Sequence, residues 1–200
     1  SGHGTFDGAI PLGHSGLKAA VIEESLVGGT CPNRGCNAKI ILDTPVALKR
    51  HLEAAHGIEA TDISLNWKEN KDNKQRIIDG LPNFIQGLLE DAGVDLISGR
   101  GVLVDAHTVE VNGEKKTAEK IVIATGLRPH RLDIKGSDLL HDSEDFMNLD
   151  VLPNRLVIIG GGYIAMEFAT MAYEAGSHVT VILPHDQILR SYYRPFSESI

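Results

Sequence analysis

Two cysteines, Cys31 and Cys36, lie in one short glycine-rich segment and are the only cysteines among the 200 residues. Their spacing allows a disulfide if Cys31 lies in a loop and Cys36 begins a helix, where the partial positive charge lowers a thiol pKa. A disulfide-stapled secreted domain would carry more cysteines, spread along the chain. Two cysteines alone do not complete a tetrahedral zinc site, and the nine histidines show no paired ligand spacing. The pattern favours a redox-active pair over its two alternatives, a metal site and a passive structural pair.

A glycine-rich turn at the start of the chain resembles part of a dinucleotide-binding fingerprint. Gly2 and Gly4 fit the later part of a Gly-x-Gly-x-x-Gly turn, and Thr5 stands where the third glycine is expected. A short apolar strand over residues 18–23 ends at Glu23, whose carboxylate can accept hydrogen bonds from ribose hydroxyls. The alternative is a plain tight turn with an exposed glutamate.

A second glycine-rich turn has the strand before it and the helix after it that a dinucleotide site needs. Residues 155–160 are expected to form a strand, 163–175 a helix that Gly176 ends, and 178–183 another strand. The turn between the first strand and the helix carries Gly160, Gly162 and Ala165. Glycine lets the backbone approach a pyrophosphate, which the N–H groups of the helix start then bind. Two such sites in one chain indicate electron transfer between two cofactors.

The segments between these turns complete an α/β pattern. Apolar residues at helical spacing predict a helix over residues 81–92, and short β-rich runs over residues 94–111 predict a small meander. Residues 120–124 are expected to return the chain to a sheet, and residues 127–154 to form a linker. The predicted fold class is α/β, with two Rossmann-like dinucleotide-binding units, the first of which holds the β-meander as an insertion.

The overall composition narrows the function further. The net charge is −8 and the basic residues form no stripe, so nucleic acid is not an expected partner. No run of about eighteen apolar residues is present, so no membrane span is expected. The chain opens on a glycine turn and stops within an expected helix, so both ends are interpreted as truncated. A missing start could hide a signal segment.

The cysteine segment, Gly28-Gly-Thr-Cys-Pro-Asn-Arg-Gly-Cys-Asn-Ala-Lys39, resembles the redox motif of the FAD-dependent pyridine nucleotide–disulfide oxidoreductases. This is the group of glutathione reductase, dihydrolipoamide dehydrogenase and mercuric reductase. Further matches are Glu23, Ala124-Thr125-Gly126 and Gly160-Gly-Gly-Tyr163-Ile-Ala-Met-Glu167. The resemblance implies the first segment of an FAD-binding domain over residues 1–126, without its first strand, and the start of an NAD(P)H-binding domain over residues 127–200.

The resemblance also implies a catalytic set of Cys31, Cys36, Lys39 and Glu167. Cys36 would be the charge-transfer thiol beside the flavin, and Cys31 the interchange thiol that attacks the substrate. Lys39 would reach the flavin and pair with Glu167, whereas without the motif each would be read as an exposed helical side chain. Tyr163 would be a movable cover over the nicotinamide, or else an ordinary half-buried aromatic residue.

The implied cofactor-binding residues fall into two sets. The FAD set is Gly2, Gly4, Glu23, Gly29, Thr30, Lys39, Gly101, Ala124, Thr125 and Gly126. The NAD(P)H set is Gly160, Gly162, Tyr163, Ala165, Glu167, His185 and Arg190. We expect NADPH rather than NADH, because Leu183 stands where NADH-preferring relatives carry an acidic residue. Arg190 matches one of the two arginines that bind the 2′-phosphate in glutathione-reductase-like relatives, and His185 is nearby.

These features together predict an enzyme that passes electrons from NADPH through FAD and a Cys31–Cys36 disulfide to a small disulfide substrate. The resemblance implies a cytoplasmic homodimer that serves cell redox homeostasis. The identity of the disulfide is not readable from the sequence. Residues 1–200 by themselves are expected to bind FAD weakly or not at all and to reduce no disulfide with NADPH. The alternatives are a flavin- and nucleotide-binding module without disulfide turnover, and a flavoenzyme that reduces a metal ion or oxygen.

Overall fold

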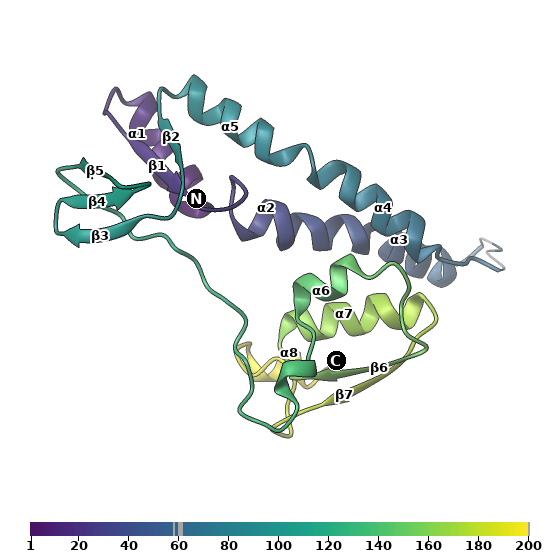
Figure 1. The fold of residues 1–200 in the computed structure, drawn as a ribbon. Coiled ribbons are helices and arrows are strands. Elements are labelled where there is room, and N and C mark those ends of the chain that lie inside the picture. Colours follow the sequence, from purple (N-terminus) through teal and green to yellow (C-terminus); the bar gives the residue numbers. More distant parts are fainter. Residues whose placement is uncertain (58, 60–61, 200) are drawn as a thin grey trace. The chain divides into compact units, whose positions relative to one another are not determined.

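The computed structural model describes residues 1–57, 59 and 62–199, which form two compact units (Figure 1). The first unit consists of residues 1–38 and 75–140. The second consists of residues 39–74 and of the chain from His141 onward. No helix among the described residues is both long enough and apolar enough to cross a membrane.

A two-stranded parallel sheet and the helices beside it form the core of the first unit. The first glycine turn leads into a π-helical segment (η1, Gly4–Ala9) that continues into α1 (Ile10–His14). Strand β1 (Ala20–Glu23) pairs in parallel with β2 (Asp95–Ser98). Helix α5 (Leu81–Asp91) has Pro82 in its first turn, where a missing N–H costs no intrahelical bond. The buried core cluster of this unit is Val21, Leu89, Ala92 and Val94.

The β-meander is present, but its strands differ from the prediction. It consists of the antiparallel strands β3 (Val102–Asp105), β4 (Thr108–Val111) and β5 (Glu114–Thr117). The prediction that the run at residues 94–98 belongs to the meander is wrong, because β2 pairs with β1 instead. Asn112 and Gly113 have φ values of 53° and 80°, which suit a tight hairpin turn and allow β5 to follow β4.

The prediction of a strand over residues 120–124 is wrong. This segment has no regular structure, and Val122 and Ile123 are 78% and 69% exposed. A strand persists only where its N–H and C=O groups meet a neighbouring strand, and no strand within the described ranges pairs with this segment. Its apolar side chains alone therefore do not make it a strand.

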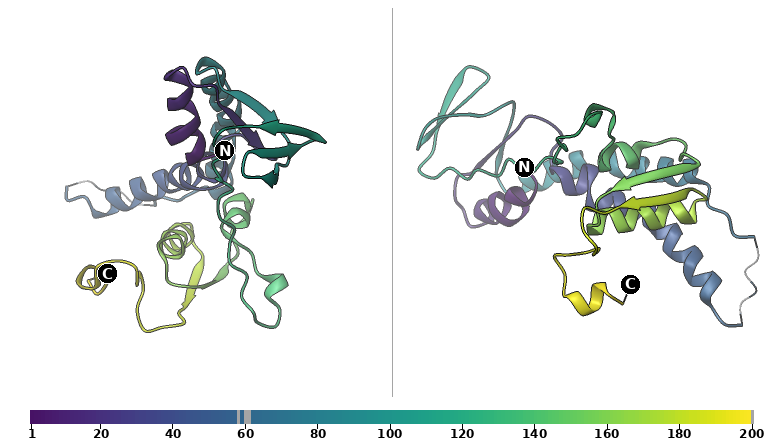
Figure 2. Two further views of the ribbon diagram at one scale, coloured as in Figure 1. Left: turned by 90° about the vertical axis from the view of Figure 1, so that its left-hand side faces the viewer. Right: turned by 90° about the horizontal axis from the view of Figure 1, so that it is seen from below.

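The second unit places helices beside another parallel strand pair, β6 (Arg155–Ile159) and β7 (His178–Ile182). Helix α7 (Tyr163–Glu174) lies against both strands (Figure 2). The order of strand, glycine turn, helix and strand is the one that the sequence predicted. The other helical segments of the structure are α2 (Thr30–Arg34), α3 (Cys36–Ala54), α4 (Trp67–Ile78), η2 (Ser137–Leu139), α6 (Ser143–Asn148) and α8 (Arg194–Ser197). The predicted linker over residues 127–154 thus contains α6, which begins with a capping box formed by Asp142 and Asp145.

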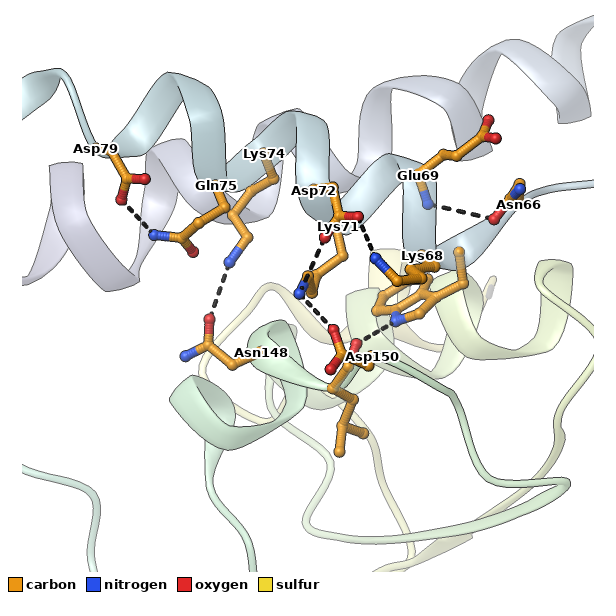
Figure 3. Close-up of polar contacts among 12 residues, drawn as sticks. Asn66, Lys68, Glu69, Lys71, Asp72, Lys74, Gln75, Asp79, Asn148 and Asp150 are labelled. Atoms are coloured by element: carbon orange, nitrogen blue, oxygen red, sulfur yellow. Dashed lines mark hydrogen bonds and ion pairs between the residues drawn. The ribbon is translucent and has the colours of Figure 1, made fainter.

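Helix α4 holds the segment that follows α6 (Figure 3). The contacts are Trp67 Nε1 to the Leu149 carbonyl oxygen at 2.8 Å, Lys71 Nζ to Asp150 Oδ1 at 2.5 Å and Lys74 Nζ to Asn148 Oδ1 at 3.0 Å. The Trp67 ring meets the edge of Phe146, which stacks on Phe168 with centroids 4.3 Å apart. Polar and aromatic contacts therefore fix α6 between α4 and α7.

Candidate functional site

The two cysteines lie on either side of the junction between helices α2 and α3. Cys31 is in the first turn of α2, and Cys36 is the first residue of α3. The chain enters α2 through Gly29, which has a φ of 69°. A Cβ atom at Gly29 would lie 3.0 Å from the Gly2 Cα atom, so only glycine fits. The first glycine turn therefore packs directly against the residue that precedes α2.

Both cysteines are free thiols, and the side chain of Cys36 lies near enough to Cys31 to shift its pKa. The side chain of Cys36 is exposed, whereas that of Cys31 is half-buried. Burial raises the pKa of the Cys31 thiol, the Cys36 sulfur raises it further, and hydrogen bonds from the backbone N–H groups of Cys36 and Asn37 offset part of the increase. Cys31 therefore keeps its proton to a higher pH than an ordinary thiol.

Residues predicted to bind FAD surround the first glycine turn. Gly2 has a φ of 81°, and a Cβ atom at Gly4 would lie 2.7 Å from the Ala124 Cβ atom. Ala124 is thus brought to the turn although it lies in no strand, and Thr125 and Gly126 follow it in the chain. The hydroxyl of Thr5 is fully buried and has no hydrogen-bond partner in the described part of the chain. Glycines in close approach and a polar group without a partner fit a phosphate-bearing ligand.

Glu23 lies at the end of β1, where the sequence predicted an acceptor for ribose hydroxyls. Its carboxylate accepts hydrogen bonds from the Ser1 hydroxyl and from the Ser25 N–H at 2.9 Å. The Glu23 carboxylate thus accepts a hydrogen bond from the Ser1 hydroxyl, as it was predicted to accept one from a ribose hydroxyl. Gly101, the predicted neighbour of adenine, lies close to the side chain of Ile22, which belongs to β1 like Glu23.

The second glycine turn is built for close approach as well. Gly160 has a φ of 120°, and Gly162 precedes α7 without any side-chain cap on the helix start. The first N–H groups of α7, including that of Ala165, therefore face no capping side chain and suit a phosphate. The Leu189 N–H donates to the Gly161 carbonyl oxygen at 2.7 Å. This bond holds the loop that carries the exposed side chains of His185 and Arg190 against the turn.

Lys39 and Glu167 meet within the second unit. The Lys39 Nζ atom lies 2.5 Å from Glu167 Oε2 and 5.0 Å from the centroid of the Tyr163 ring. The structure therefore contains the ion pair of Lys39 with Glu167 that the resemblance implied, and it places the Tyr163 ring beside Lys39. Sequence reasoning missed Asp43, which lies one helical turn after Lys39 on α3. Burial raises the pKa of the Asp43 carboxyl, and the nearby Glu167 raises it further.

Among residues 1–57, 59 and 62–199, no group of three or more His, Cys, Asp or Glu side chains is placed to hold a metal ion.

Comparison with known proteins gives consistent matches. A family model described as pyridine nucleotide-disulphide oxidoreductase matches residues 1–200. The chain is 39% identical to a glutathione reductase from Nostoc sp. over 88% of this chain and 39% of that protein. It is 33% identical to a mercuric reductase from Lysinibacillus sphaericus over 100% of this chain and 38% of that protein.

A similar solved structure is the Cu(II) complex of the HOCl-induced flavoprotein disulfide reductase RclA from Escherichia coli. The TM-score is 0.79 at 29% identity, over 95% of this chain and 42% of that one. The chain spans about two fifths of the length of these relatives. The matches confirm the resemblance and the α/β fold class with Rossmann-like units. The chain belongs to the pyridine nucleotide-disulphide oxidoreductase family.

Proposed function

We propose that the protein is an FAD-dependent disulfide reductase that takes electrons from NADPH and delivers them, through the Cys31–Cys36 pair, to a small disulfide. The observation that carries this proposal is the placement of the two free thiols on either side of the junction between α2 and α3, where Cys36 is near enough to raise the pKa of Cys31. Family membership implies FAD and a pyridine nucleotide, whereas the choice of NADPH and of substrate is our proposal. We also propose a cytoplasmic homodimer that serves redox homeostasis, as the relatives named glutathione reductase suggest.

The chain's own residues would perform the thiol steps. The Cys31 thiolate attacks one sulfur of the substrate disulfide, and the leaving sulfur takes a proton and departs as a thiol. The Cys36 thiolate then attacks the Cys31 sulfur, which re-forms the Cys31–Cys36 disulfide and releases the second thiol after another proton transfer. Bound FAD would supply the two electrons that reopen this disulfide. The exposure of Cys36 leaves its sulfur accessible to a cofactor.

We assign the nucleotides to the two glycine turns. The proposed FAD-binding domain covers residues 1–126, in which Glu23 holds the ribose and the turn at Gly2 and Gly4 receives the pyrophosphate. The proposed NAD(P)H-binding domain begins within residues 127–200, with the pyrophosphate at the start of α7. Arg190 and His185 would bind the 2′-phosphate, because an arginine pairs with phosphate through charge-assisted hydrogen bonds. The ion pair of Lys39 with Glu167 would place a cation near the flavin.

A metal ion is a second candidate substrate, because one of the relatives is a mercuric reductase. The two possibilities share the same thiols and differ in what the thiols receive. A soft metal ion would bind both thiolates, whereas a disulfide would be attacked by one.

The test uses the complete protein, loaded with FAD, together with NADPH and, in turn, glutathione disulfide, lipoamide and Hg²⁺. We expect NADPH consumption with one of the disulfides. Iodoacetamide should abolish this NADPH consumption only when it is added after NADPH has reduced the enzyme. The oxidised enzyme holds Cys31 and Cys36 in a disulfide, which leaves no thiol to alkylate. Turnover of Hg²⁺ without any disulfide would select the second candidate. Turnover that survives alkylation of the reduced enzyme would contradict both.

A further inference from the structure

We propose that Asn33 is the positioning residue of the cysteine pair, an assignment that rests on the proposed function. Asn33 lies between the two cysteines in α2. Its Nδ2 atom donates one hydrogen bond to the Val27 carbonyl oxygen and one to the Gly29 carbonyl oxygen, both at 2.9 Å. The side chain thus ties the short cysteine helix to the backbone that leads into it.

Helix α2 needs such an external tie. It has five residues, which is too short to be stable by its own hydrogen bonds, and Gly29 provides no side-chain cap. Without Asn33, the backbone at Gly29 would be held mainly by one long hydrogen bond, from its N–H to the Leu26 carbonyl oxygen at 3.4 Å.

The burial of the Asn33 amide indicates that its donors matter. The Oδ1 atom is buried and has no hydrogen-bond partner in the described part of the chain. A buried acceptor without a partner costs free energy. The two bonds from Nδ2 must offset that cost, and they do so by fixing the backbone immediately before Cys31. Asn33 therefore acts on the chemistry through the position of Cys31 and not by touching a reacting atom.

The expected consequence concerns the equilibrium between dithiol and disulfide. Cys31 and Cys36 give two protons and two electrons to glutathione disulfide, which forms the Cys31–Cys36 bond and two molecules of glutathione. The equilibrium constant depends on the effective concentration of one thiol at the other. A looser α2 lowers that concentration, so loss of the two hydrogen bonds should weaken the protein disulfide.

The experiment measures this constant in glutathione redox buffers with the FAD-loaded protein, by alkylation and mass spectrometry. The variant is Asn33→Leu, which is close in volume and adds no charge. The matched control is Asn70→Leu. The Asn70 Nδ2 atom also donates to a backbone carbonyl, that of Leu42 at 2.8 Å, and its Oδ1 atom is also buried without a hydrogen-bond partner among the described residues. Asn70 lies in α4, within the second unit.

We expect Asn33→Leu to lower the constant about tenfold, which is about 30 mV for a two-electron couple. Asn70→Leu should leave it unchanged although it also loses stability. If Asn33→Leu does not fold, Asn33→Ser takes its place. An unchanged constant in the folded Asn33 variant, or an equal change in the Asn70 variant, would overturn the assignment. Failure of the unmutated protein to form any Cys31–Cys36 disulfide would instead refute the proposed function.

Discussion

Glu167→Gln separates the structural from the chemical role of the ion pair between α3 and α7. The pair is close, with 2.5 Å between Lys39 Nζ and Glu167 Oε2. The side chains are 17% and 41% exposed, so water screens the interaction, and its contribution to stability is at most about 1 kcal/mol. For a protein of this size the unfolding midpoint should fall by no more than about 4 °C.

The effect on turnover should be larger. A charge-assisted interaction that holds a cation in place contributes about 1.5–3 kcal/mol. Loss of that amount from the transition state lowers kcat by roughly ten- to 150-fold. The reason is that Lys39 without its anionic partner is free to leave the position that Glu167 and the Tyr163 ring define.

Glu174→Gln is the matched control, because it removes a second ion pair between the same two helices. Lys49 Nζ lies 2.6 Å from Glu174 Oε2, and each side chain is 14% exposed. This variant should unfold at a lower temperature than Glu167→Gln and should keep its turnover. Fluorescence of Trp67, the one tryptophan of the chain, follows unfolding, and NADPH oxidation follows turnover. Full turnover of Glu167→Gln, or equal losses of turnover in both variants, would refute the reasoning.

Three further predictions use other parts of the structure. Asp43→Asn should stabilise the protein at neutral pH, because burial and Glu167 raise the folded-state pKa of Asp43 and its ionisation therefore opposes folding. The free energy of unfolding, measured at several pH values, should show the advantage of the variant shrink as the pH falls through that folded-state pKa. The advantage should vanish below the unfolded-state pKa of about 3.8. Arg190→Ala should remove most of the preference for NADPH, a loss of about 1.5–3 kcal/mol measured as the ratio of kcat/KM for NADPH and NADH, and equal use of both by the unmutated enzyme would contradict this assignment. Gly29→Ala should lower the unfolding midpoint more than Gly57→Ala, because both have positive φ but only the Cβ atom at residue 29 would meet backbone within 3.0 Å.

Local patterns in the sequence predicted the second glycine turn well. An apolar strand, a glycine turn and an amphipathic helix follow one another within about thirty residues, and neighbours in sequence here are neighbours in space. The cysteine motif likewise carries its own geometry, since Cys31 lies in the short helix α2 and Cys36 begins the adjacent helix α3.

Long-range pairing was harder to predict. The run at residues 94–98 has the same local character as the meander strands, and only its parallel partner β1 assigns it to another sheet. The apolar run at residues 120–124 looks like a strand by composition but lacks a partner among the described strands. Phe84 has the helical spacing of a core residue, yet it is 63% exposed, because the buried face of α5 is narrow and contains Ile85 and Leu89.

For the site, too, the sequence predicted residues that belong to a local motif but not the contacts that depend on tertiary packing. The family motif pointed to Lys39 and Glu167, whereas the unusual environment of Asp43 depends on how α3 packs against α7. Asn33 lies in the motif, but its role depends on two backbone carbonyl groups that only the folded loop brings within reach. Such contacts follow from tertiary structure and have no separate signature in the sequence.

Absorbance of the FAD-loaded protein after anaerobic two-electron reduction tests the proposed function most directly. A thiolate beside oxidised flavin gives a long-wavelength charge-transfer band, which we assign to Cys36. Cys31→Ser should keep the band, because Cys36 then has no partner for a disulfide, and Cys36→Ser should abolish it. The opposite pattern, or a band that survives both substitutions, would contradict the assigned roles of the two cysteines.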